Sequence, residues 1–137
     1  MIHNTEFLNN GISIEFKDAE RSIFSVIENC TFDIDDNLSD VVFTNHVRLS
    51  RVSGINVKNC DFDFSNTEDI TIGNGLNTFN AKFKVWDCTF KNLTYGINSA
   101  NGGGSIANYE IDNNIFENNY FGVFSNDVDF GLSLIHI

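Results

Sequence analysis

The sequence predicts an all-β solenoid, a stack of about five similar coils built from short strands. Two observations predict this fold. A six-residue phrase recurs five times along the 137 residues, and the residues before the phrases alternate between inward and outward character. The phrase reads aliphatic residue, any residue, Asn or Asp, small polar residue, any residue, Phe. It begins at Ile2, Ile27, Val57, Val85 and Ile111.

The period of the phrase indicates a repeat architecture. Successive Phe residues of the phrase lie 25 to 30 positions apart, a period at which each unit buries its apolar face only against its neighbours. Coils that stack at the spacing of hydrogen-bonded strands, about 4.8 Å, place each side chain on its equivalents above and below. We therefore expect one stacked aromatic column, made of Phe7, Phe32, Phe62, Phe90 and Phe116.

The first strand of each coil is expected to lead into the phrase. In the fourth repeat, for example, Ala81, Phe83 and Val85 occupy every second position. Alternation with a period of two predicts a strand that buries one face. The aliphatic residue of the phrase then belongs to the buried face, together with the Phe column.

A bend is expected at the Asn or Asp of each phrase, because a short amide or carboxylate tolerates left-handed backbone and bonds to nearby N–H groups. This column contains Asn4, Asn29, Asn59, Asp87 and Asn113. After each Phe a turn follows, and a second short strand is often opened by Gly, most clearly at Gly11, Gly96 and Gly122. Glycine there supplies backbone angles that other residues resist.

Three phrases carry cysteine at the same position, and these are the only cysteines of the chain: Cys30, Cys60 and Cys88. A disulfide framework favours even numbers and irregular spacing. Side chains that point the same way on successive coils also suit the dihedral angle of a disulfide poorly. We therefore interpret the three residues as buried free thiols that act as small apolar side chains.

These features resemble the right-handed parallel β-helix superfamily, the pectate-lyase-like solenoids. The resemblance rests on the phrase, on the Asn-Asn-x-x-Gly turn after it, and on the stretches Asn45 to Val57 and Asn80 to Val85, which look like secreted β-helix proteins of Bacteroidetes-type bacteria. It covers Ile2 to about Phe124. It implies a right-handed parallel β-helix and an extracellular or outer cell-surface location. It implies no single activity, because the superfamily contains lyases, hydrolases and adhesins.

The two ends of the chain depart from the repeat. The first phrase is already under way after Met1, and the last six residues, Leu132 to Ile137, match the translation of a transposase end sequence used in DNA library preparation. We expect residues 1–131 to be a β-helix repeat fragment of a longer solenoid and residues 132–137 to be a non-native tail. The alternative for the tail is a hydrophobic closing strand. Uncapped coils are expected to self-associate through their ends.

Composition argues against several partners. The net charge is −11 and the sequence pI is about 4.3, whereas binding to phosphate groups needs clustered Lys and Arg. We therefore expect no nucleic-acid partner and no anionic-membrane surface. No apolar run is long enough to span a bilayer, so we expect no membrane span.

The outward row that follows the aliphatic column contains no catalytic cluster. It reads His3, Glu28, Lys58, Trp86 and Asp112. Neighbouring coils are expected to pair Glu28 with Lys58 and, two positions earlier, Lys84 with Glu110. A polysaccharide lyase needs several acids around Ca²⁺, and a glycoside hydrolase needs two or three facing acids. These rows provide neither.

An acidic stretch is a weak candidate for a calcium site, and no other cofactor is predicted. It lacks the Gly and the terminal Glu of a helix-loop-helix calcium site, and the alternative is a solvated turn. The candidate ligands are Asp33, Asp35, Asp36 and Asp40.

Three outward aromatic residues are candidates for stacking on sugar rings: Trp86, Tyr95 and Tyr120. Single exposed aromatics are common, so the alternative is that they have no role. The sequence favours a non-catalytic structural or display segment of a secreted or cell-surface bacterial protein, with carbohydrate or cell-surface ligands. The alternative function is a fragment of a polysaccharide lyase or glycoside hydrolase whose catalytic coils lie outside this chain.

Overall fold

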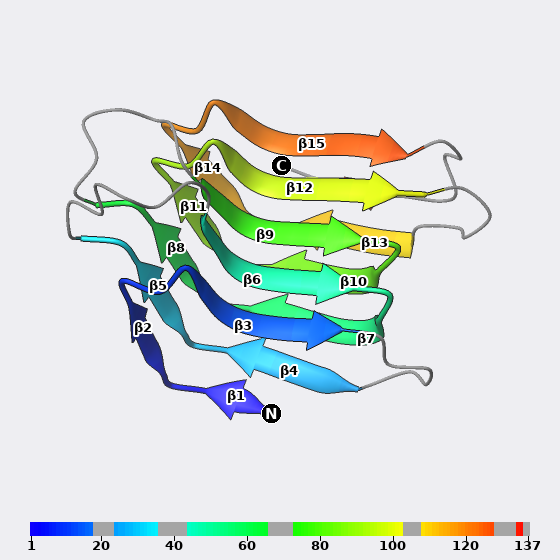
Figure 1. Ribbon diagram of the computed structural model, residues 1–137, viewed down its shortest axis with the longest axis horizontal. Helices are drawn as coiled ribbons and strands as arrows, with labels where there is room; N and C mark the ends of the chain where they lie inside the picture. Colours follow the sequence, from blue (N-terminus) through cyan, green and yellow to red (C-terminus); the bar gives the residue numbers. More distant parts are fainter. Residues whose placement is uncertain (18–23, 36–43, 66–72, 103–107, 128–133, 136–137) are drawn as a thin grey trace.

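The computed structural model describes residues 1–17, 24–35, 44–65, 73–102, 108–127 and 134–135. All strands in these ranges belong to three parallel sheets, and these ranges contain no helix (Figure 1). The chain passes through the three sheets in turn, called sheet 1, sheet 2 and sheet 3 from its N-terminus, and then returns to sheet 1 one strand further along. This arrangement confirms the predicted fold class, an all-β parallel solenoid, and agrees with a right-handed parallel β-helix.

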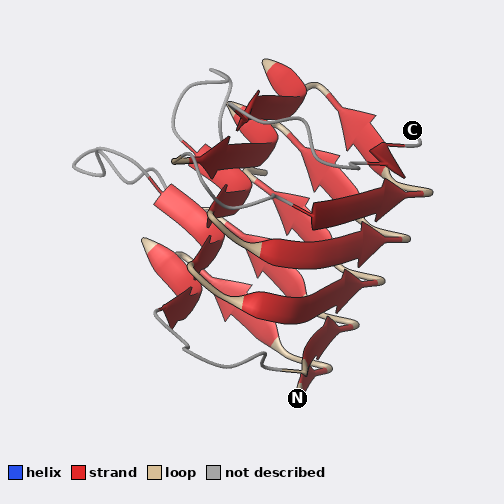
Figure 2. Cartoon of the chain, turned by 90° about the vertical axis from the view of Figure 1, so that its right-hand side faces the viewer, coloured by secondary structure: helices blue, strands red, loops and turns tan. Residues whose placement is uncertain are grey.

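Each sheet receives one strand from every coil, and the strands stack along the solenoid axis (Figure 2). Sheet 1 contains β1 (Ile2–His3), β4 (Ser25–Glu28), β7 (Ser53–Lys58), β10 (Lys82–Trp86), β13 (Asn108–Asp112) and β16 (Leu134–Ile135). Sheet 2 contains β2 (Glu6–Leu8), β5 (Thr31–Asp33), β8 (Asp61–Asp63), β11 (Thr89–Lys91) and β14 (Ile115–Glu117). Sheet 3 contains β3 (Ile12–Lys17), β6 (Thr44–Ser50), β9 (Gly73–Phe79), β12 (Tyr95–Asn101) and β15 (Phe121–Asp127).

The chain makes about four full turns between β1 and its equivalent β13, where about five coils were predicted. The numbers differ because five repeated phrases enclose four complete turns. Strand β16, which lies in the tail predicted to be non-native, pairs in parallel with β13 and aligns Ile135 with Ile111. The backbone of Leu134–Ile135 thus continues the register of sheet 1, and the origin of the tail stays a prediction.

A column of phenylalanine rings runs through the interior behind sheet 2. Neighbouring ring centroids are 4.7 to 5.1 Å apart, and the planes differ by 2 to 8°. The three central rings are fully buried. From the first coil to the last, the stack contains Phe7, Phe32, Phe62, Phe90 and Phe116.

The cysteines lie in a second interior column and are free thiols, each about 1% exposed. Each thiol donates to the backbone carbonyl two residues before it, and for Cys60 the acceptor is Lys58 at 3.1 Å. The hydrogen bond with Cys60 and burial both hold the pKa of Cys88 well above its usual range. In the fifth coil Asn114 takes this place and binds the backbone of Cys88 and Val85 at 2.9 and 3.0 Å.

The Asn and Asp residues of the phrase make the bend between sheet 1 and sheet 2. All five have left-handed backbone, with φ between 50 and 55°, at Asn4, Asn29, Asn59, Asp87 and Asn113. Their side chains form a ladder in which each amide donates to the coil before it, as Asn29 does to Asn4 at 3.2 Å and Asn113 does to Asp87. A carboxylate has no N–H to donate, so Asp87 interrupts this ladder towards Asn59.

A second left-handed column, which the sequence analysis missed, makes the bend after sheet 2. Asn9, Asn92 and Asn118 have φ of 53 to 55°, and each lies two residues after a Phe of the column. Asn118 donates to Asn92 at 2.7 Å, and Asn92 donates to Asp63 at 2.7 Å. The repeated Phe-x-Asn spacing was the available signal.

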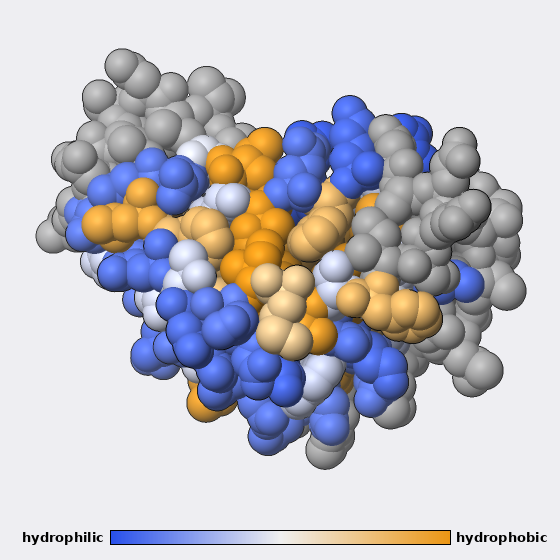
Figure 3. Space-filling view, turned by 90° about the horizontal axis from the view of Figure 1, so that it is seen from below, coloured by the Kyte–Doolittle hydropathy of each residue, from blue (hydrophilic) through white to orange (hydrophobic). Residues whose placement is uncertain are grey.

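The end of the solenoid that carries β1, β2 and β3 exposes part of its interior. Seen along the axis, hydrophobic side chains gather at the centre of this face and hydrophilic ones surround them (Figure 3). Ile2, Phe7 and Phe16 are only partly buried here against the core. Self-association through this end stays a prediction.

The described residues contain no helix with the length and apolar character needed to cross a bilayer.

Candidate functional site

Four aromatic rings form a cluster on the outer face of sheet 3. Tyr95 of β12 stacks on its register partner Phe121 of β15, with ring centroids 5.2 Å apart and planes 9° apart. Phe124 packs against both rings at 5.5 and 5.6 Å, and Tyr120 meets Phe121 edge-on at 4.7 Å. Tyr120 is 69% exposed, and Phe121 and Phe124 are each 38% exposed. The cluster therefore presents aromatic surface to solvent.

Polar side chains continue the same face towards the first coils. The register aligns Phe124 with Asn98, Asn98 with Asn77, and Asn77 with Arg48. Arg48 forms an exposed ion pair with Glu15 at 3.6 Å. Amide and guanidinium groups thus lie along the solenoid axis beside the aromatic cluster.

A shallow hollow lies on this polar part of the face. It has a volume of about 240 Å³ and is lined by residues of β6 and β9, including Arg48, Ser50, Asn77 and Phe79. Phe79 is 41% exposed. Aromatic surface next to a few directional polar groups is the usual composition of a site that orients a small polar ligand.

Trp86, the third aromatic candidate, lies on a different sheet. It belongs to β10 of sheet 1, where its register partners are Lys58 and Asp112, and its side chain is half-buried. The described ring contacts of Tyr95 and Tyr120 are with Phe121 and Phe124, not with Trp86. The fold therefore brings the two tyrosines into one cluster and leaves the tryptophan apart from them.

The predicted cross-strand ion pairs of sheet 1 are confirmed. Glu28 and Lys58 approach to 2.7 Å, and Lys84 and Glu110 approach to 2.8 Å. All four side chains are at least 29% exposed. Each pair therefore contributes only on the order of 0.2–1 kcal/mol to the stability of the fold.

Only part of the candidate calcium site can be described. Asp33 accepts hydrogen bonds from the N–H and hydroxyl of Ser65 at 3.0 and 2.7 Å. Asp35 exchanges two hydrogen bonds with Asn9, at 2.8 and 3.0 Å. Asp36 and Asp40 lie outside the described residues, and within the described ranges no three acidic, His or Cys side chains are arranged to hold a metal ion. The calcium site stays a prediction.

The fold brings together acids that the sequence analysis did not connect. Asp33 and Asp63 are register partners on the outer face of sheet 2, and Asp61 lies beside them around a hollow of about 280 Å³. Burial and, more weakly, the charge of Asp33 raise the pKa of Asp63, against the hydrogen bond from Asn92. The sequence search tested only rows on sheet 1. The available signal was the recurrence of Phe-Asp, at Phe32-Asp33 and Phe62-Asp63.

Comparison with known proteins gives no family. No protein-family model, no curated protein and no solved structure matches this chain.

Proposed function

We propose that this chain is a non-catalytic, rigid display segment of a secreted or cell-surface bacterial β-helix protein, and that it binds glycans on the outer face of sheet 3. The observation that supports this proposal is the exposed cluster of Tyr95, Tyr120, Phe121 and Phe124. Contiguous exposed apolar surface on a small protein commonly marks a binding site.

The chemistry of the face favours sugars over a purely apolar ligand. Aromatic rings provide flat surface for the C–H faces of a sugar, while Asn77, Asn98 and Arg48 provide donors and acceptors for its hydroxyl groups. Parallel strands hold these groups at coil spacing, about 4.8 Å. A ligand that lies along the axis meets them in succession without any loop having to close.

Glycan binding is tested by screening residues 1–137 on an array of bacterial, plant and animal glycans and then titrating the best ligand. Tyr120→Ala is expected to weaken binding about threefold to tenfold, the effect of losing one stacking ring. Trp86→Ala is the matched control, because it removes an aromatic residue from sheet 1. A result in which Trp86→Ala abolishes binding and Tyr120→Ala does not contradicts the assignment to sheet 3.

One observation favours the alternative function, a polysaccharide-cleaving enzyme. The carboxylates around the sheet 2 hollow include Asp63, whose raised pKa suits a general acid. Against this, Asp33 is held by Ser65 and Asp63 by Asn92, as expected for groups that hold neighbouring coils together. Release of reducing ends or unsaturated products from polysaccharides, lost in Asp63→Asn, is the result that favours the enzyme.

A further inference from the structure

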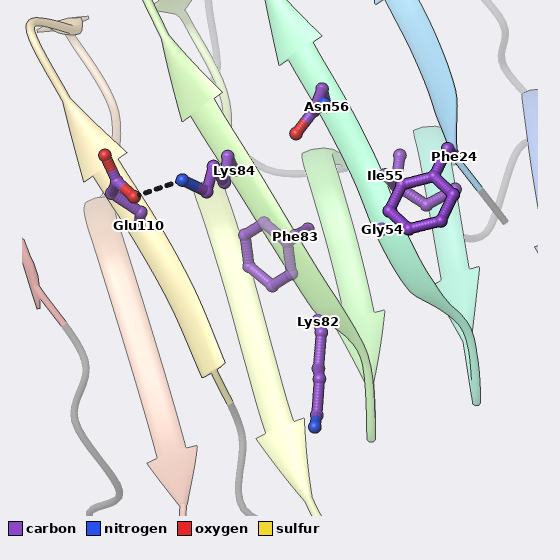
Figure 4. A pocket seen from close by; sticks show the side chains of 8 residues that line it. All are labelled: Phe24, Gly54, Ile55, Asn56, Lys82, Phe83, Lys84 and Glu110. Carbon is purple, nitrogen blue, oxygen red and sulfur yellow. Dashed lines mark ion pairs between the residues drawn. The ribbon is translucent and has the colours of Figure 1, made fainter. Parts of the chain in front are cut away.

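The outer face of sheet 1 carries a hollow of about 260 Å³ that extends across four neighbouring strands (Figure 4). It is lined by Phe24, which directly precedes β4, by residues 54–56 of β7, by residues 82–84 of β10 and by Glu110 of β13. This hollow lies on a different sheet from the aromatic cluster of sheet 3.

A register shift between β7 and β10 opens the hollow. Lys82 pairs with Ser53 and Phe83 pairs with Ile55, which leaves Gly54 as an extra residue. Gly54 has a φ of 82°, a conformation that residues with a Cβ resist. Because this residue has no side chain, the outer surface is recessed at the point where the neighbouring strands carry side chains.

Phe24 provides an apolar wall for the hollow. Ser25 is the register partner of Ile55, which places Phe24 beside Gly54, as Figure 4 also shows. Its side chain is 88% exposed, the highest value among the large hydrophobic side chains that are described. Removal of apolar surface from water is favourable, so an apolar group that covers Phe24 gains free energy. Ile55 and Phe83 are buried beneath and belong to the core.

The hollow also offers a positive charge in an acidic protein. Of the eight Lys and Arg residues in a chain of net charge −11, Lys58, Lys82 and Lys84 lie on this face of β7 and β10. Lys58 and Lys84 are paired with Glu28 and Glu110. Within the described part of the chain, Lys82 is exposed and makes no ion pair. Its ammonium group points away from Phe24 in Figure 4 and is available to an anion at that edge of the hollow.

We propose that this hollow binds a small aromatic carboxylate, with the ring against Phe24 over Gly54 and the carboxylate at the Lys82 ammonium group. The volume fits such a ligand: a cavity of about 150 Å³ accommodates benzene, and pockets for drug-sized molecules begin at about 300 Å³. A single ring with a short acidic substituent lies between these limits. The apolar wall selects the ring, and the lysine selects the charge.

The test is a titration of isotope-labelled residues 1–137 with three matched probes. Binding is monitored through the chemical shifts of the backbone amide NMR signals. Phenylacetate carries the ring and the charge, phenylacetamide carries the ring alone, and glucuronate carries the charge on a sugar. We expect saturable shifts at Phe24, Gly54 and Lys82 with phenylacetate. Phenylacetamide is expected to bind about twofold to fivefold more weakly, the effect of one exposed ion pair. Binding of phenylacetate, but not of phenylacetamide, is expected to weaken as salt is raised.

Two variants and two matched controls assign the effect to named side chains. Phe24→Ala is expected to weaken phenylacetate binding about threefold to tenfold, and Lys82→Gln is expected to remove the preference for phenylacetate over phenylacetamide. Phe79→Ala removes an exposed ring from sheet 3 and Lys91→Gln removes a lysine from sheet 2, and both are expected to leave binding unchanged. The proposal is overturned by the absence of saturable shifts, by glucuronate binding as well as phenylacetate, or by an equal loss in the Phe79→Ala control.

Discussion

The phenylalanine column inside the solenoid and the tyrosine–phenylalanine stack outside sheet 3 have nearly the same geometry but different environments. Phe32 and Phe62 stack at 4.7 Å and are fully buried. Tyr95 and Phe121 stack at 5.2 Å, and Phe121 keeps 38% of its surface exposed. Parallel strands produce both stacks, because register partners lie directly above one another. Burial then decides whether a stack stabilises the fold or remains available to a ligand.

The largest effect is expected from truncation of the inner stack. Phe62 has a ring on each side, at 4.7 Å from Phe32 and from Phe90. Phe62→Ala leaves a cavity in the middle of the core and is expected to lower the free energy of unfolding by about 3–5 kcal/mol. Urea denaturation followed by circular dichroism measures it. A loss below about 1 kcal/mol shows that the phenylalanine stack contributes little to the stability of the fold.

Lowering the pH is expected to have the next largest effect on the free energy of unfolding, because a histidine is buried beside the phenylalanine column. His46 lies against Phe32, Phe62 and Phe64, with ring centroids 5.3 to 6.1 Å away. Burial lowers its pKa from 6.5 to about 4, although its bond to the carbonyl of Asp63 and the charge of Asp33 act in the opposite direction.

The sign of the pH effect follows from that shift. Between about pH 6.5 and pH 4 the unfolded state binds the proton and the folded state does not, so stability is fully present above pH 6.5 and falls as the pH drops to 4. The loss is about 3 kcal/mol. Comparing urea curves of the wild type and His46→Gln across this range isolates the effect from that of the carboxylates. Parallel pH profiles for the two proteins contradict it.

Truncation of the outer stack is expected to cost less than truncation of the inner one. Phe124 touches Tyr95 and Phe121 but is 38% exposed. Phe124→Ala is expected to lower the free energy of unfolding by about 1 kcal/mol, the value of one aromatic contact, and to weaken glycan binding at the same time. Equal costs for Phe124→Ala and Phe62→Ala show that burial does not separate the two stacks.

The smallest effect is expected at the outward ion pairs of sheet 1. Lys84 and Glu110 are 57% and 44% exposed at a separation of 2.8 Å, so water screens most of their attraction. A double-mutant cycle with Lys84→Ala and Glu110→Ala is expected to give a coupling energy below about 0.5 kcal/mol, which decreases further with salt. A coupling above about 1 kcal/mol indicates that this face is less solvated than its exposure implies.

The interior columns of the repeated phrase were predictable residue by residue, whereas sheet 3 was not. Tyr95 and Phe121 each lie five positions after the Phe of their phrase. Asn45 lies thirteen positions after Phe32, and Asn74 lies twelve positions after Phe62. Alignment of the sequence on the repeated phrase therefore does not predict which residues of sheet 3 pair with one another in the middle coils. The pairing of Tyr95 with Phe121 follows from their equal spacing and was available from the repeat, whereas the pairing of Asn45 with Asn74 was not.

The sequence by itself determined that the chain forms parallel coils, which side chains of the repeated phrase point inward, and which Asn and Asp residues bend the backbone between sheet 1 and sheet 2. These properties follow from the repeat, because a side chain that recurs once per coil stacks on its equivalent. Only the tertiary structure decided that Tyr95 meets Phe124 and that Phe24 lies beside the recess at Gly54. A contact between different positions of the repeat places Phe124 against Tyr95, and a shifted register places Phe24 beside Gly54. Neither follows from the repeat, because the repeat aligns only residues at equal distances from the phrase.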